Sequence, residues 1–69
     1  MKKEEKIWIA SKYAAKGYSY DDLKYGDDLY NYSGDELEEL MDDIWGYVTE
    51  YRDFGSVAFR EKYKDHKLY

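Results

Sequence analysis

The sequence predicts an all-α fold, a small bundle of three main helices over about 4–16, 34–54 and 56–66, with a short helical turn near 19–25. Three observations predict it. Apolar residues recur at steps of three and four, which places them on one face of a helix. Glycines stand where helices should end, and no segment alternates apolar and polar residues as a half-buried strand does. At this length, residues 1–69 form a single helical domain.

The first helix, over 4–16, contains no Gly or Pro and should end at Gly17, a residue that readily adopts the left-handed conformation of a C-terminal cap. Its apolar residues cover nearly the whole circumference. A helix of this kind is normally buried, or it exposes a surplus apolar face to a partner. We expect it to lie at the centre of the bundle. The alternative is a homodimer through this helix.

The short turn near 19–25 begins at a weak capping signal, Ser19 followed by acidic residues, and should end at Gly26. The long helix over 34–54 is the clearest element. Ser33 and Glu36 match a capping box, in which each side chain accepts from the backbone N–H of the other residue. The apolar stripe that should face the core consists of Leu37, Leu40, Met41, Ile44, Trp45, Val48 and Tyr51.

Gly55 should stop the long helix, and Ser56 should begin the last one. The apolar residues that we expect on this last helix are Val57, Phe59, Tyr63 and, towards its end, Leu68.

Charge is distributed unevenly along the chain. The formal net charge is −5, but residues 19–50 carry eleven Asp or Glu against Lys24, whereas both ends are mildly basic. This acidic block would be repelled by nucleic-acid phosphates and by anionic membranes, so we expect no direct binding to either. The longest apolar run near the N-terminus is four residues, too short for a signal peptide or a membrane span. We therefore expect a cytoplasmic protein.

Residues for catalysis or metal binding are scarce. The chain has no Cys and one histidine, His66, which lies in a basic segment and is expected to be solvated. An EF-hand loop with Gly34 at its sixth position would place Leu29 and Leu40 where carboxylates are needed. We predict no catalytic residue, no metal and no cofactor, and therefore no enzyme. Loose binding of divalent cations by the acidic doublets is an alternative.

One segment, 12–23, has the rhythm of a helix-turn-helix corner, in which a helix ends at Gly-Tyr and a second one begins. The second helix of such a motif should present Arg, Lys, Asn or Gln to a DNA groove. Here it would present Asp21, Asp22 and Lys24, and it would stop at Gly26. We interpret the segment as a plain turn between two helices.

The acidic residues of the long helix step away from its apolar stripe and should face solvent. Steps of three or four residues separate them by about 4.5–6 Å, comparable to the phosphates of a nucleic-acid strand. Tyrosines of the preceding segment add rigid area and hydroxyls, as at interface hot spots. The predicted partner-binding surface consists of Tyr20, Asp21, Asp22, Asp27, Asp28, Tyr30, Tyr32, Asp35, Glu38, Glu39, Asp42 and Asp43.

In its size and in the acidic run of residues 19–50, the chain resembles small acidic phage-encoded inhibitors of host defence nucleases, including anti-CRISPR and anti-restriction proteins. The resemblance implies a nucleic-acid mimic that acts in the host-cell cytoplasm and occupies a basic surface of a nuclease or CRISPR effector. It lies in bulk properties and no motif carries it, so no residue role is transferred. The basic ends depart from the most acidic members and leave another partner surface open. The alternative is a small helical structural or regulatory module whose charge serves solubility.

Overall fold

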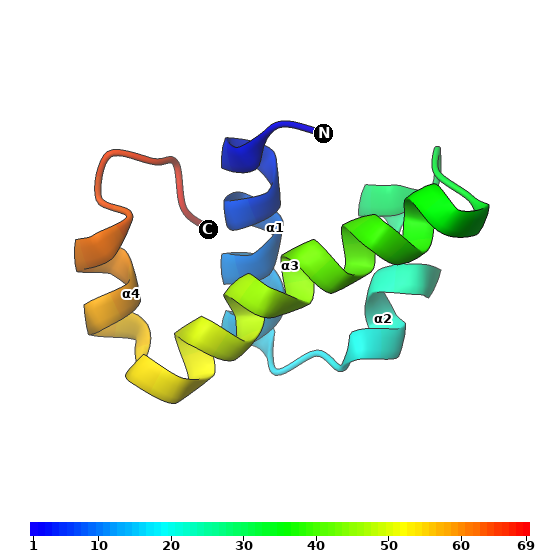
Figure 1. The fold of residues 1–69 in the computed structure, drawn as a ribbon. Coiled ribbons are helices and arrows are strands. Elements are labelled where there is room, and N and C mark those ends of the chain that lie inside the picture. Colours follow the sequence, from blue (N-terminus) through cyan, green and yellow to red (C-terminus); the bar gives the residue numbers. More distant parts are fainter.

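The computed structural model describes all residues from Met1 to Tyr69 and contains four α-helices and one 3-10 turn. The elements are α1 (Lys3–Lys16), α2 (Tyr20–Tyr25), η1 (Asp27–Leu29), α3 (Gly34–Phe54) and α4 (Ser56–Lys62). No strand is present, so the all-α prediction is confirmed. In Figure 1, α3 crosses α1 obliquely, α2 lies beside the first half of α3, and α4 follows its other end.

Two glycines end helices as the sequence predicts. Gly17 has φ 72°, and its N–H donates to the carbonyl of Ala14, closing α1. Gly55 has φ 90°, and its N–H donates to the carbonyl of Tyr51 at the end of α3. Both are conformations that a residue with a Cβ adopts only with strain. The observed bounds of α3 are therefore those expected from its sequence.

The predicted capping box at the start of α3 is not formed. Ser33 makes no side-chain cap hydrogen bond, and Gly34 enters the helix at φ 60°, a left-handed conformation outside the capping-box geometry. A cap of this type is found instead at α2, where the N–H of Ser19 donates to Asp22 Oδ2 at 2.7 Å. The signal that looked weaker in the sequence is therefore the one that the fold uses.

The last helix is shorter than predicted, since α4 ends at Lys62 and not at 66. Tyr63 leaves the helical conformation at φ −110°, ψ 31°, and its hydroxyl donates to the carboxylate of Glu50 at 3.0 Å. The chain then turns back towards α1 (Figure 1), where the N–H of Tyr69 donates to Ser11 Oγ at 2.9 Å. These tertiary contacts end the helix early.

The core is built around α1, as the first of the two interpretations predicted. Ile9, Ala10 and Tyr13 join Leu23, Leu29 and the inner face of α3 in the larger cluster. The buried side chains of that inner face are Leu40, Met41, Ile44 and Val48. Each such side chain, if fully removed from water, contributes about 1.5–3 kcal/mol. Leu37, Trp45 and Tyr51 complete the predicted stripe but are only half-buried.

A second, smaller cluster covers the other side of α1. Ile7 packs there with Phe59 of α4 and with Tyr63, and half-buried Leu68 packs against them from the returning segment and not from a helix. Val57, which we expected among the apolar residues of the last helix, is 82% exposed. Ile9 is 5% exposed, so it belongs to the core of the single chain.

Trp45 lies at the edge of the core between two polar residues. Its ring meets the ring of Tyr20 edge-on at 5.7 Å between centroids, and the guanidinium of Arg52 lies 5.0 Å from the indole centroid. The same guanidinium donates to the carbonyl of Tyr18, in the loop before α2. Trp45 thus helps to fasten α2 to α3, although it is not a fully buried core residue.

Candidate functional site

The five acidic residues that we placed on the outer face of α3, namely Asp35, Glu38, Glu39, Asp42 and Asp43, are all exposed. Two of them are engaged within the fold. Asp43 forms an ion pair with Lys6 of α1 at 2.8 Å. Asp42 accepts a hydrogen bond from the Tyr20 hydroxyl at 2.7 Å. Asp35, Glu38 and Glu39 form no ion pair and no hydrogen bond between side chains, and so present full charges to solvent.

Tyr20 is half-buried and connects α2 to α3 through contacts of its side chain. Its hydrogen bond to Asp42, which must be given up if the phenol ionises, raises the pKa of Tyr20 to about 12. Its ring rests edge-on against Trp45. The two contacts fix α2 against α3, so the Tyr20 side chain forms part of the surface between these two helices.

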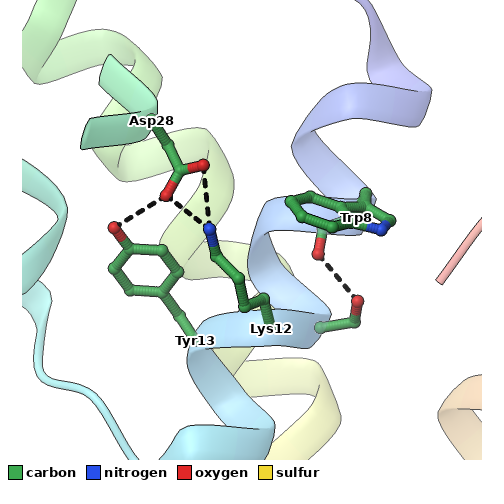
Figure 2. Close-up of polar contacts among 5 residues, drawn as sticks. Trp8, Lys12, Tyr13 and Asp28 are labelled. Atoms are coloured by element: carbon green, nitrogen blue, oxygen red, sulfur yellow. Dashed lines mark hydrogen bonds and ion pairs between the residues drawn. The ribbon is translucent and has the colours of Figure 1, made fainter. Parts of the chain in front are cut away.

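Asp28 is also used inside the fold (Figure 2). Its carboxylate accepts from Lys12 Nζ at 2.9 and 2.8 Å and from the Tyr13 hydroxyl at 3.0 Å. Burial, together with the bond to Asp28, raises the pKa of Tyr13. Lys12 Nζ also lies 4.9 Å from the ring of Trp8. This network holds η1 on α1, and Asp28 is therefore engaged within the chain.

The remaining predicted residues lie on α2, on η1 and in the segment that follows. Asp22 caps α2, whereas Asp21 and Asp27 are exposed and form no ion pair. Tyr32 is half-buried against the larger core cluster. Tyr30 is 77% exposed, as a contact residue should be.

Sequence reasoning left Tyr25 out of the predicted surface. It is 78% exposed, more than any other tyrosine in the chain. The signal was available: Tyr25 follows Leu23 by two residues on α2, a step of about 200° around the helix. Because Leu23 is fully buried, Tyr25 has to point to the opposite side. With Tyr30 it supplies two unburied aromatic rings beside the exposed carboxylates.

A groove of about 370 Å³ separates α2 from the first half of α3. Leu37 and Met41 supply apolar surface, Tyr20 supplies an aromatic ring, and Asp21 and Glu38 supply carboxylates. The remaining lining residues are Lys24 and Gly34. This groove therefore brings together an exposed acidic residue of α2, Asp21, and one of α3, Glu38.

His66 is not the solvated side chain that the sequence predicted. It is half-buried, its ring lies 5.8 Å from that of Tyr63, and its Nδ1 atom is buried without a hydrogen-bond partner. No group of three or more His, Asp or Glu residues is arranged to hold a metal ion. No helix is both long and apolar enough to span a bilayer.

No family model matches the sequence, and no curated protein or solved structure matches it either.

Proposed function

We propose that this protein is a non-catalytic binding protein whose acidic, tyrosine-rich middle, residues 19–50, occupies a basic surface of a partner protein. The partner class that fits best is a nucleic-acid-binding enzyme such as a nuclease of a host defence system, which the protein would inhibit by covering the site of the nucleic acid. Nuclease inhibition rests on the resemblance in size and charge, whereas binding to a basic surface rests on the residues themselves.

One observation carries the proposal: several exposed carboxylates of the acidic block form no ion pair or side-chain hydrogen bond within the fold. They are Asp21, Asp27, Asp35, Glu36, Glu38 and Glu39, none of which forms an ion pair. A surface that serves solubility normally mixes both signs of charge, because mixed pairs add a little stability and like charges subtract it. Lys24 is the one base within residues 19–50. Unrelieved negative charge in a small domain suits a positively charged partner.

The exposed tyrosines support the same function. Tyr25 and Tyr30 leave most of their rings in water, although a small domain stabilises itself mainly by burying such surface. Beside carboxylates, an aromatic ring offers Arg or Lys both a π face and a salt-bridge partner. We assign the two rings as anchors that are desolvated when the partner binds, while the carboxylates steer its approach.

The experiment begins with capture of the partner from a bacterial lysate at low and at high salt. Capture should weaken with salt, because exposed charges are screened beyond about 10 Å at 0.1 M ionic strength. Binding kinetics of Glu38→Lys/Glu39→Lys should then show a strongly reduced association rate. Neither glutamate forms an ion pair or a side-chain hydrogen bond within the fold, whereas Asp42 accepts a hydrogen bond from Tyr20, so the variant should remain folded.

The matched control is Asp53→Lys/Asp65→Lys, which changes the net charge equally on exposed residues that lie outside the acidic block and form no ion pair. Its association rate should fall much less. Tyr25→Ala and Tyr30→Ala should leave association nearly unchanged and speed dissociation, as loss of aromatic anchors does. If both charge variants slow association equally, only the total charge matters and the proposed surface is wrong.

A second candidate, a structural or regulatory helical module, is favoured by a different observation. Asp28, Asp42 and Asp43 each fasten one element to another, so part of the acidic block has a structural use. If Glu38→Lys/Glu39→Lys folds and every captured protein binds it at the wild-type rate across salt concentrations, this candidate replaces the first.

A further inference from the structure

The groove between α2 and α3 combines apolar surface, an aromatic wall and carboxylates that form no ion pair. We propose that it is the receptor for one arginine side chain of the basic partner. The inference rests on the proposed function. It adds the place on the acidic surface where the partner binds and the partner side chain that binds there. Figure 1 shows the two helices that form the walls, α2 and the first half of α3.

The inner part of the groove suits the aliphatic stem of a long basic side chain. Met41 is buried and Leu37 is half-buried, and both line the groove together with the ring of Tyr20. Arginine and lysine commonly lay their methylene groups along such apolar surface while their charge stays at the rim. A groove of about 370 Å³ is near the lower end of the range for ligand sites, which fits a single side chain.

The two helices bring a carboxylate each to the same groove. Asp21 comes from the first turn of α2 and Glu38 from the second turn of α3, and both are exposed and free of ion pairs. A guanidinium carries a planar fork of N–H donors, so it can donate to two carboxylates at once and stack on an aromatic ring, whereas an ammonium is a point charge. The lining therefore favours arginine over lysine.

Lys24 is the internal competitor of that arginine. It lines the groove and is exposed, and its Nζ lies 5.8 Å from the ring of Tyr25 without an ion pair to any carboxylate. A guanidinium in the groove would be repelled by this ammonium. Removing Lys24 should therefore strengthen binding, an effect that damage to the fold does not produce.

The test uses the whole chain and a short peptide of alternating Arg and Gly, with Lys and citrulline versions as comparison probes, at about 0.15 M salt. Binding is followed by backbone amide chemical shifts. The Arg peptide should give saturable shifts at Tyr20, Asp21, Leu37 and Glu38, bind several-fold more tightly than the Lys peptide, and outcompete the citrulline peptide completely. Lys24→Ala should raise the affinity for the Arg peptide several-fold.

Glu38→Gln and Glu39→Gln form the decisive pair of variants. They remove the same charge from adjacent residues of α3, but Glu39 lies at a separate hollow beside Lys6 and Asp43. Glu38→Gln should lower the affinity for the Arg peptide roughly threefold to fivefold, the upper part of the range for one exposed charge pair. Glu39→Gln should change it by much less, because it alters only the distant field.

Equal losses in the two variants, or equal binding of the Arg and Lys peptides, would overturn the arginine site and leave the basic-partner proposal standing. A titration without saturable shifts at the residues that line the groove would overturn the arginine site as well. The proposed function is judged separately, by the kinetics of Glu38→Lys/Glu39→Lys with the captured partner.

Discussion

Gly46 should be the easiest position at which to stabilise this protein. It lies in the middle of α3, is exposed, and has an ordinary negative φ. A Cβ added there would meet no heavy atom within 4 Å. Glycine inside a helix is unfavourable because the flexible unfolded chain loses more conformational entropy at glycine than at any other residue. Nothing in the packing of this helix requires a glycine at this place.

The expected gain from Gly46→Ala is about 0.8–1.0 kcal/mol, the difference in helix propensity between the two residues. Burial adds nothing, since the methyl group stays in water. For a domain of this size, 1 kcal/mol corresponds to about 4–8 °C in Tm. Against a total stability of about 5 kcal/mol, such a gain is large enough to measure without ambiguity.

The assay is thermal and urea unfolding followed by circular dichroism, with Gly26→Ala as the matched control. Gly26 also has a negative φ, −80°, but a Cβ there would collide with the hydroxyl of Tyr13. That substitution should destabilise the protein and disturb the bond between Tyr13 and Asp28. If Gly46→Ala gives no gain while the helix content is unchanged, the account of an open, unstrained site at Gly46 fails.

Three further perturbations test the core and the pH response. Phe59→Ala should lower the free energy of unfolding by about 3–5 kcal/mol and leave little folded protein in urea titrations, because Phe59 is 1% exposed. Trp45→Ala should lower it by less, since that ring is half-buried. The reverse order would contradict the burial pattern. Ile9→Lys should abolish helical structure, and a folded monomer in sedimentation would show that Ile9 is not a core residue. The pKa of Tyr20 is raised from 10.0 to about 12 by its bond to Asp42, so this contribution to stability should be complete below pH 10 and lost as the pH rises through about 12. In unfolding experiments at increasing pH, Tyr20→Phe should lack that part of the alkaline loss of stability. An identical dependence of the free energy of unfolding on pH in the variant and the wild type would show that the bond makes no pH-linked contribution.

The elements that the sequence predicted well are those set by local pattern. The bounds of α3 follow from a stripe of apolar residues at helical spacing and from Gly55, both of which can be read over one short segment. The end of α4 and the turn η1 could not be read in this way. The end of α4 depends on the bond from Tyr63 to Glu50, and η1 is held by the bond from Lys12 to Asp28, and a local pattern contains neither of these contacts between distant residues.

The candidate site divides in the same manner. Helical periodicity predicted that the acids of α3 face solvent, because they lie opposite the apolar stripe. It could not predict which carboxylates the fold itself would use. Lys6 reaches Asp43 across 37 positions of sequence, and Lys12 reaches Asp28 across 16. Such pairings follow from how α1 docks against its neighbours, which only the three-dimensional arrangement reveals.

The central place of α1 has a consequence for biosynthesis. Within this domain α1 leaves the ribosome before the other helices, and Phe59, which covers Ile7, is synthesised about 43 residues after Lys16. At about 5–20 residues per second, roughly 2–9 s pass between the synthesis of this central helix and the synthesis of its cover. Throughout that interval the segment from Ile7 to Ala10 is open to chaperones and to other nascent chains. Expression yield should therefore respond to chaperone supply more than the modest size of the domain would suggest.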